Sequence, residues 1–519
     1  MITGQQIRTR YFILYIIVIT AFLLYYYCCW DGQLFRLHFA NVIFPPEVSW
    51  TEYGARNTTS HKNDFRYDWL RMHRARTDWR AILRPCSDQM AWGTLKSGWG
   101  KVNRSSAKTS YISYMDIQPS GHFSRIFIQT QTASGRMKTV GGDFWRVFFT
   151  GPANVSATVF DHQNGTYEAI ALLVETGNYA VQAYLDYSLC DGLRNPPEDW
   201  FRVGNSQGRY QRQGTLGFLD HYIYEPLRAA QNLIFEVLPN TSRSGIDDIS
   251  TIKCTNSCRS LWDGHGRWRN NIWLPYLSAN PQRRKNISRP RTATPRKGAL
   301  WIFGDSLGIR FYNSLLQKPL CKELLVSCHR SYNWVYPVPF ENEVLGKSLT
   351  DDFDFRPNII IDSIRNVLRY ALMKSPHSLL VLNLGLHYPS TLNFTTFQKL
   401  MDDVIVMLRD REKRLGSNAR VVWKTTTSIR KENEEPPRND TVWRFFTEPR
   451  IRLFDAYAMS AMCKAGFEVL DVFPVTASYL PGTIDIVHYT DDVFNTAEIE
   501  LEKYVKIGME YESTAVCIK

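Results

Sequence analysis

The sequence predicts an α/β protein in which a carboxyl-terminal domain with a parallel sheet is preceded by a β-sandwich and one transmembrane helix. Three observations carry this prediction. Residues 11–30 are apolar and uncharged, residues 105–190 alternate apolar and polar side chains, and residues 298–519 alternate short apolar runs with helical stripes. A chain of 519 residues is long enough for two or three domains.

The apolar segment reads YFILYIIVITAFLLYYYCCW and contains 20 residues. A helix of that length, at about 1.5 Å per residue, spans the roughly 30 Å hydrocarbon core of a bilayer. Arg8 and Arg10 precede it, so the positive-inside rule places residues 1–10 in the cytosol as a tail and the rest in a lumen. We expect a signal anchor rather than a cleaved signal peptide, because the run is long and no small-residue cleavage site follows.

Sequons and cysteines support a luminal body. Eight cysteines follow the apolar segment, an even number that is consistent with four disulfides. Cys254 and Cys258 have the spacing of half a zinc site, but no second pair accompanies them, so we predict no metal. The predicted glycosylation sites are Asn57, Asn103, Asn154, Asn164, Asn240, Asn286, Asn393 and Asn439.

The chain is basic, with 62 Lys and Arg against 50 Asp and Glu and a net charge of +12. Such an excess fits an acidic partner, namely a sialylated or sulfated glycan, a nucleic acid or a membrane surface. Charge alone does not choose among these, and a basic surface without a specific partner fits equally well. The predicted luminal location excludes nucleic acid from the expected partners.

Residues 105–190 are predicted to form an immunoglobulin-like sandwich, because turn signals separate about seven short alternating runs. Asn164-Gly165 favours a tight hairpin, since both residues tolerate positive φ. The spacing of Gly142-Asp143-Phe144, Gly151-Pro152 and Gly177-Asn178-Tyr179 resembles filamin-type repeats. We expect this domain to serve as a scaffold.

Less regular regions flank the predicted sandwich. Residues 31–104 are expected to form a luminal stem packed loosely against the body. Residues 191–297 are expected to be a disulfide-tied connecting region that ends in a basic linker. The basic residues of 283–297 fit either a solvated linker or a rim that attracts anions.

From residue 298 onward, strands and helices are predicted to alternate. Buried strands are indicated at 299–304, 378–384, 419–424 and 467–472, and helices at 359–374, 397–408, 455–465 and 491–505. This alternation implies a mostly parallel sheet with helices on both faces.

Polar segments follow the predicted strands of this domain, where the ligand site of an open parallel sheet lies. Ser306, in Gly304-Asp305-Ser306, follows the first strand and opens a helix, so its N–H can face a developing oxyanion. Asn383 and Gly385 end a later strand and offer further donors. Asp485 and His488 stand three residues apart before the last helix.

This set predicts nucleophilic catalysis. A serine hydroxyl is a weak nucleophile, so His488 would take the proton of Ser306 while Asp485 fixes the imidazole tautomer. Each element alone has a structural explanation, since G-D-S is a common turn and helix N-cap and a lone D-x-x-H pair is usually a surface coincidence. Their order along one α/β domain favours the catalytic interpretation.

The order GDS, NLG and DIVH resembles the SGNH/GDSL hydrolases, and more closely their PC-esterase branch. That branch includes plant trichome-birefringence-like polysaccharide O-acetyltransferases and the animal NXPE (neurexophilin and PC-esterase domain) proteins. The NXPE resemblance covers most of the chain: the anchor, a sandwich carrying Gly141-Gly142-Asp143-Phe144, the loop at 262–266 and the GDS domain.

The resemblance implies an SGNH-like three-layer domain over residues 298–519, with Ser306 as nucleophile, His488 as base and Asp485 as orienting acid. It also implies an oxyanion hole from the Ser306 N–H, Asn383 and Gly385, although the G-x-N-D form of bacterial hydrolases is missing. Arg310 matches an arginine that is frequent one turn after GDS in this branch. It would bind a substrate carboxylate or pair with a nearby acid, and both alternatives stay open.

The function that follows is a Golgi-type luminal enzyme that moves an acetyl group onto or off a glycan hydroxyl through an acyl-serine. The acetyl donor, such as acetyl-CoA, is a co-substrate, and no bound cofactor is expected. The net charge favours an acidic acceptor such as sialic acid. One alternative is a non-catalytic membrane glycoprotein whose sandwich binds a protein partner. Another is a glycosyltransferase, for which Asp351-Asp352-Phe353-Asp354 is the nearest D-x-D sequence.

Overall fold

The protein is described by a computed structural model that divides the chain into two compact units, Met1–Lys62 and Asn63–Lys519. All described residues belong to the second unit. They are residues 64–92, 100–197, 200, 221–231, 233–240, 245, 260–277, 296–332, 357–433 and 444–507. Within these ranges, no helix has the length and apolar character needed to cross a membrane. The predicted anchor at residues 11–30 lies outside them.

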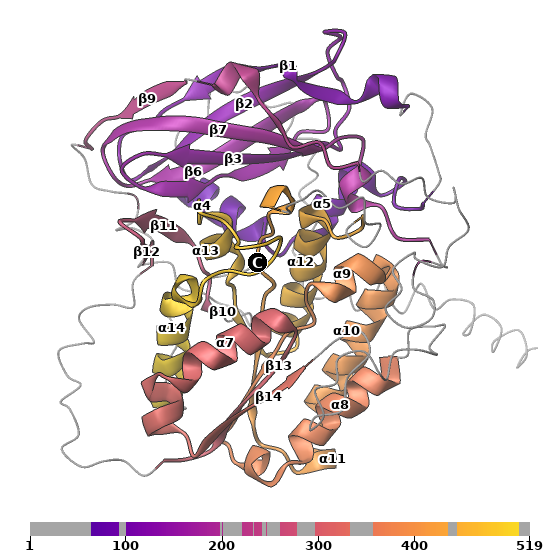
Figure 1. The fold of residues 1–519 in the computed structure, drawn as a ribbon, viewed down its shortest axis with the longest axis vertical. Coiled ribbons are helices and arrows are strands. Elements are labelled where there is room, and N and C mark those ends of the chain that lie inside the picture. The colour runs from indigo at the N-terminus through magenta and orange to yellow at the C-terminus, as the bar shows by residue number, and fades with distance from the viewer. Residues whose placement is uncertain are drawn as a thin grey trace, which may run out of the picture. The chain divides into compact units, whose positions relative to one another are not determined.

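Two antiparallel sheets occupy the amino-terminal half of this unit (Figure 1). The first has the order β1-β2-β6-β5 and consists of β1 (Ser105–Asp116), β2 (His122–Thr132), β6 (Thr166–Leu173) and β5 (Thr158–Asp161). The second has the order β12-β11-β4-β3-β7-β8, with β9 also paired to β7. Its strands are β12 (Ile272–Pro275), β11 (Gly266–Arg269), β4 (Asn154–Ser156), β3 (Phe144–Thr150), β7 (Gly177–Tyr187), β8 (Glu225–Pro226) and β9 (Ile234–Val237).

Alternating side chains of these sheets share one apolar core, which includes Ile126, Val147, Ala169 and Val181. The predicted short strands over residues 105–190 are therefore confirmed. The predicted hairpin joins β5 to β6 at Gly165, whose φ is +84° and whose missing side chain leaves room for the carbonyl of Lys138. The finer assignment to an immunoglobulin-like or filamin-type fold stays a prediction.

A six-stranded parallel sheet forms the centre of the carboxyl-terminal half, in the order β10-β17-β16-β15-β13-β14. Its strands are β10 (Ser260–Trp262), β17 (Glu468–Leu470), β16 (Arg420–Lys424), β15 (Leu379–Leu382), β13 (Ala299–Gly304) and β14 (Ser327–Tyr332). All neighbouring strands pair in parallel. From β13 the chain passes to β14 on one side and then to β15 on the other. This reversal opens a crevice at the carboxyl ends of β13 and β15.

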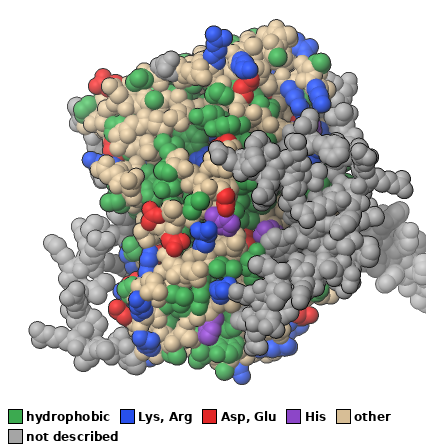
Figure 2. All heavy atoms as spheres, viewed as in Figure 1, with side chains coloured by type: hydrophobic (Ala, Val, Ile, Leu, Met, Phe, Trp, Pro, Cys, Tyr) green, Lys and Arg blue, Asp and Glu red, His purple; other side chains and the backbone are tan. Residues whose placement is uncertain are grey.

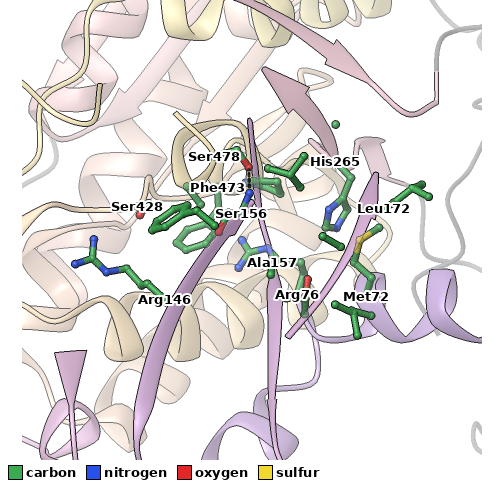
Figure 3. Close-up of a pocket in the computed structure, with 18 of the residues that line it drawn as sticks. Met72, Arg76, Arg146, Ser156, Ala157, Leu172, His265, Ser428, Phe473 and Ser478 are labelled. Carbon is green, nitrogen blue, oxygen red and sulfur yellow. Dashed lines mark hydrogen bonds between the residues drawn. The ribbon is translucent and has the colours of Figure 1, made fainter. Parts of the chain in front are cut away.

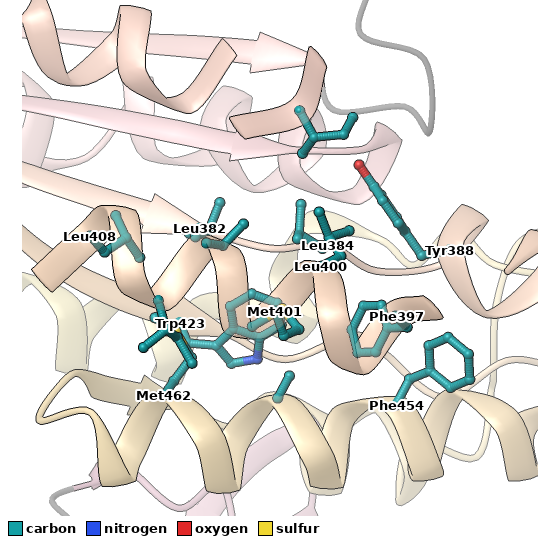
Figure 4. Packing of buried hydrophobic residues seen from close by; sticks show 14 of the residues in the cluster. Leu382, Leu384, Tyr388, Phe397, Leu400, Met401, Leu408, Trp423, Phe454 and Met462 are labelled. Atoms are coloured by element: carbon teal, nitrogen blue, oxygen red, sulfur yellow. The ribbon is translucent and has the colours of Figure 1, made fainter. Parts of the chain in front are cut away.

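Helices cover both faces of the parallel sheet, as the prediction required (Figure 1). On one face, α7 (Ser306–Leu316) and α14 (Asn495–Ile507) pack on side chains such as Ile302 and Val381. On the other, α8 (Pro357–Arg369), α10 (Phe394–Arg409) and α12 (Glu448–Lys464) pack on the alternate side chains. Figure 4 shows Leu382 and Trp423 of the sheet against Met401 of α10 and Met462 of α12.

The remaining helices are short, apart from α4 (Phe65–Arg74). They are α5 (Trp79–Leu83), α9 (His387–Thr391), α11 (Arg411–Leu415) and α13 (Phe473–Ala477). The 3-10 turns span Arg84–Cys86, Lys101–Asn103, Asp191–Leu193, Arg228–Ala230, Ala371–Lys374, Lys431–Asn433 and Asp491–Phe494, and a π-helical turn spans Leu320–Leu324.

The expectation of a loosely packed stem is wrong for residues 64–92. Trp69 of α4 is buried, and Arg76 forms an ion pair with Asp471 at 2.8 Å, beyond the end of β17. A disulfide joins Cys86 to Cys190, a second joins Cys321 to Cys328, and Cys463 is also disulfide-bonded. The Arg76–Asp471 ion pair and the Cys86–Cys190 disulfide tie the segment to both halves of the unit.

The region 191–297, predicted to be a connecting region, contributes strands to two of the sheets. Its strands β8, β9, β11 and β12 extend the second antiparallel sheet, and β10 adds an edge strand to the parallel sheet. The predicted boundaries at residues 190 and 298 therefore fall inside both architectures. The sequence did not reveal these strands because each is only two to four residues long, too short for a periodic pattern.

Candidate active site

Ser306 lies where the sequence predicts it, directly after β13 and at the first position of α7. The carboxylate of Asp305 caps this helix by accepting hydrogen bonds from the N–H groups of Leu307 (3.0 Å) and Gly308 (3.4 Å). Within the described residues, the N–H of Ser306 itself donates no hydrogen bond. A half-buried hydroxyl and an unengaged N–H therefore share the amino-terminal end of an 11-residue helix, where developing negative charge is stabilised.

His488 bridges Ser306 and Asp485, although Ser306 stands 182 residues away in the sequence. Its Nε2 lies 2.9 Å from the Ser306 Oγ, and its Nδ1 lies 2.6 Å from the Asp485 Oδ2. With Nδ1–H donating to the carboxylate, Nε2 is the acceptor for the serine hydroxyl. The three predicted catalytic side chains are thus brought into one hydrogen-bonded chain.

Hydrogen bonds within the loop that carries Asp485 and His488 stabilise its conformation. The second oxygen of Asp485 accepts hydrogen bonds from the backbone N–H groups of Val487 and His488, both at 2.8 Å. Burial opposes ionisation of Asp485, but the hydrogen bonds from His488 and from these amides outweigh it and hold the pKa of Asp485 below its usual value. The carboxylate is therefore charged at neutral pH, as an orienting acid must be.

The site is open to solvent on the acid side. The side chain of Asp485 is 54% exposed and that of His488 is 23% exposed. Figure 2 shows histidine side chains beside acidic and basic ones toward the middle of the displayed face. A substrate can therefore approach the imidazole and the serine hydroxyl without a rearrangement of the core.

An apolar cluster lies beside Ser306 and His488. It includes their sequence neighbours Leu307 and Val487, together with Leu386, Ile486 and Phe473. Because these side chains pack against one another, the three loops that bring the polar groups together are fixed by this packing.

Asn383 and Gly385 lie beside Ser306 across the β13–β15 pair, but their donors are engaged. The Asn383 amide donates to the carbonyl of Lys424 (2.8 Å), and the N–H of Gly385 donates to the Asn383 Oδ1 (3.0 Å). In this arrangement neither group is directed at an oxyanion. Their predicted oxyanion role stays a prediction that requires the β15 loop to turn.

His387 is a second imidazole near the triad, and the sequence analysis did not name it as a site residue. It follows Leu386, whose φ of +36° is strained for a non-glycine residue. Burial, and then the proximity of His488, lower the pKa of His387 to about 3, so that this ring is neutral at physiological pH. The signal in the sequence was the histidine two residues after Gly385.

A buried lysine lies near Asp305, the residue before Ser306. Lys424 ends β16, and its Nζ lies 5.3 Å from the ring of Phe311 on α7. Burial lowers the pKa of Lys424 to about 8, against the opposing attraction of Asp305 and Asp455. Burial also raises the pKa of Asp305, and Lys424 opposes that change. The charge of Lys424 thus supports the carboxylate that caps α7.

Arg310 lies one turn after Ser306 on the same face of α7. It is half-buried, and it makes no hydrogen bond or ion pair with any described residue. Of the two alternatives left open by the sequence, the ion pair with a nearby acid is therefore absent from the described part of the chain.

The described residues contain no cluster of three or more metal-ligating side chains. Cys254 and Cys258 lie outside them, as do Asp351–Asp354 and the sequons at Asn57, Asn286 and Asn439. Asn164 is exposed at the hairpin, and the other predicted glycosylation sites are half-buried: Asn103, Asn154, Asn240 and Asn393.

Comparisons with known proteins leave the site to be judged on its own geometry. No protein-family model and no curated protein matches the chain. One matching crystal structure aligns with 42% of this chain and 100% of its own, at 11% identity and a TM-score of 0.28. Another is a Corynascus thermopiles (Myceliophthora fergusii) carbohydrate esterase family 2 (CE2) enzyme plus carbohydrate binding domain. It shows 9% identity over 78% of this chain and 97% of that chain, with a TM-score of 0.26. TM-scores of this size carry no argument about function.

Proposed function

We propose that the protein is a serine-dependent carbohydrate O-acyltransferase or O-acetylesterase, anchored by residues 11–30 with its body in the Golgi lumen. The observation that carries the proposal is the continuous chain from the Ser306 Oγ through His488 to Asp485, with distances of 2.9 and 2.6 Å. Both lie within the hydrogen-bond reach that general-base catalysis requires.

The first half-reaction makes an acyl-serine. The Ser306 oxygen attacks the carbonyl carbon of an acetyl donor while its proton passes to the His488 Nε2. The oxyanion that forms lies near the unengaged N–H of Ser306 at the start of α7. Collapse of this intermediate expels the donor's leaving group, which takes the proton back from His488.

The second half-reaction reverses these proton movements. His488 removes a proton from an acceptor hydroxyl, whose oxygen attacks the acyl-serine and releases Ser306. A sugar hydroxyl as acceptor gives an O-acetylated glycan, and water as acceptor gives hydrolysis. The two outcomes share all protein groups and differ in how well water is excluded.

Arg310 and the net charge of +12 support an acidic acceptor such as sialic acid. A guanidinium without a partner among the described residues, on the same helix face as the nucleophile, suits recognition of a carboxylate. The retained Ser306, His488 and Asp485 chain supports an enzyme over the non-catalytic glycoprotein, because a relict site need not keep these hydrogen bonds.

The test uses the purified full chain with an activated acetyl ester. We expect acetyl-enzyme at Ser306 by mass spectrometry, and a loss of turnover of about 10³-fold or more in Ser306→Ala. Ser113→Ala, which removes an exposed hydroxyl on β1, should leave the rate unchanged. Equal turnover in wild type and Ser306→Ala would refute the mechanism and leave the anchored glycoprotein.

A further inference from the structure

A cavity of about 50 Å³ lies between the antiparallel sheets and the parallel-sheet domain. In Figure 3, Ser156 and Ala157 of the antiparallel half face Phe473 and Ser478 of the other half. The backbone N–H of Ser156 donates to the Ser478 hydroxyl at 3.0 Å, across the boundary between the two halves. The cavity is thus enclosed by both halves and is separate from the rim that carries Ser306.

Its lining is rich in positive charge. Four guanidinium groups line it, those of Arg76, Arg146, Arg430 and Arg452, against the single carboxylate of Glu448. Carboxylates outside the cavity pair with two of them: Asp471 with Arg76, and Asp186 and Glu432 with Arg146. Arg430 and Arg452 have no ion pair among the described residues.

The two arginines without ion pairs are held by aromatic rings. The guanidinium carbon of Arg430 lies 4.9 Å from the ring centre of Phe148, and that of Arg452 lies 5.4 Å from that of Phe144. Stacking covers the faces of these groups but does not use their N–H edges. The Nη2 group of Arg430 donates a hydrogen bond to the carbonyl of Ala477. Arg452 donates no hydrogen bond to any described residue.

Other lining residues also carry unused nitrogen atoms. Among the described residues, the buried Arg76 Nη1 and His265 Nε2 have no hydrogen-bond partner. Arg76 is 6% exposed and His265 is 7% exposed, so bulk water does not satisfy these groups. A buried donor without an acceptor costs about 1–3 kcal/mol, and unsatisfied nitrogen atoms beside the unpaired Arg452 indicate a missing acceptor. The pKa of Arg452, lowered to about 10 by burial and by Arg76 against the attraction of Glu448, agrees with uncompensated positive charge.

We infer that this cavity binds a small inorganic anion of halide size, such as chloride. A halide ion accepts hydrogen bonds from several N–H groups at once and donates no hydrogen bond. This matches a lining whose unsatisfied nitrogen atoms are mostly donors. The volume exceeds what one water molecule needs, so it can accommodate such an ion. Glu448 cancels one charge of the lining and accepts a hydrogen bond from the Ser428 hydroxyl at 2.5 Å, but Arg430 and Arg452 together leave the lining positive.

The bound ion would stiffen the base of the candidate active site. Phe473 and Ala477 line the cavity and also belong to the apolar cluster beside Ser306 and His488. The N–H of Arg430 donates to the carbonyl of Ile486, between Asp485 and His488, at 2.9 Å. Occupancy of the cavity therefore bears directly on the loop that carries the base.

The first measurement is thermal unfolding of the full chain in detergent, in sodium chloride or sodium gluconate at equal ionic strength. Because a ligand bound only to the folded state stabilises it, we expect a saturable rise in Tm of about 2–5 °C in chloride. Arg452→Met keeps the length and the ring contact but removes the guanidinium, and should abolish the difference between the salts. Arg228→Met, at an exposed position, should retain it.

The second measurement is anomalous scattering from crystals grown in sodium bromide, which does not depend on any variant folding. A bromide peak in the cavity supports the site, and water density there overturns it. Equal Tm values in both salts, or an unchanged chloride effect in Arg452→Met, also overturn it. Ser306→Ala should keep the full chloride effect, so an inactive enzyme would not affect this conclusion.

Discussion

Two polar clusters among the described residues are built in opposite ways. At the rim of the parallel sheet, Ser306, His488 and Asp485 form a short chain of hydrogen bonds that is open to solvent. Between the two halves, Arg76 and Arg146 form buried ion pairs with Asp471, Asp186 and Glu432. The first arrangement leaves the Ser306 and His488 side chains accessible, whereas the second pairs its charges in the interior, where Arg76–Asp471 and Arg146–Glu432 join segments of the two halves. Under the proposed function, chemistry and cohesion belong to different polar groups.

The sharpest test of the buried cluster is Arg76→Met. Arg76 donates two hydrogen bonds to Asp471, which is 1% exposed, so the substitution leaves a carboxylate unpaired in the interior. We expect the free energy of unfolding to fall by about 3–5 kcal/mol. Chemical denaturation monitored by tryptophan fluorescence measures this change.

The matched control is Arg414→Met. It breaks a surface ion pair with Asp410 at 3.0 Å, whose side chains are 74% and 39% exposed. Such pairs contribute about 0–1 kcal/mol. If the two substitutions destabilise the protein equally, the buried pair is not what holds the segment 64–92 to the parallel-sheet domain.

Asp485→Asn tests the cluster of Ser306, His488 and Asp485 by its effect on activity rather than on stability. The amide cannot hold the His488 Nδ1–H tautomer as the carboxylate does, so we expect kcat to fall by about 10–10³-fold with little change in KM. The loss should be smaller than for Ser306→Ala, because Asp485 is half exposed and water can take over part of its role. Steady-state kinetics with an activated acetyl ester measures the effect.

Stability should remain close to that of the wild type in Asp485→Asn. An exposed carboxylate contributes little to folding, so the Tm should change far less than in Arg76→Met. If Asp485→Asn unfolds readily but retains its kcat, then Asp485 contributes to stability and not to catalysis, and the proposed division between the two clusters is wrong.

The two clusters also differ in how far the sequence predicts them. Ser306 follows β13 (Ala299–Gly304), whose apolar run is plain and which lies at its predicted bounds, whereas His488 lies in the loop after α13 and was found by its spacing to Asp485. The edge strand β14 was not predicted, since its side chains are mostly half-buried and its sequence, SCHRSY, is polar. Helix α12 begins at Glu448 rather than at Asp455, because its first turns bury charged residues such as Arg450.

The buried cluster has no sequence signature. Its two arginines and three carboxylates come from five separate segments and have no fixed spacing, so only the folded chain brings them together. Arg450 illustrates the difficulty: it is fully buried, and it donates to the backbone carbonyls of Pro389 and Leu392. In the sequence such a residue is indistinguishable from a surface arginine. Motifs at strand ends are therefore predictable, whereas charge networks between domains are not.

The smallest expected effect concerns Arg310, which belongs to neither cluster but lies one turn from the nucleophile. Because it has no partner among the described residues, Arg310→Met should not destabilise the fold. It should raise KM for a sialylated acceptor about tenfold, while KM for the neutral, unsialylated form of the same glycan stays constant. Arg310→Lys should recover part of the loss, since it restores the charge without the bidentate geometry. An equal rise in KM for both acceptors would show that Arg310 shapes the site rather than recognising a carboxylate, and would remove the argument for an acidic substrate.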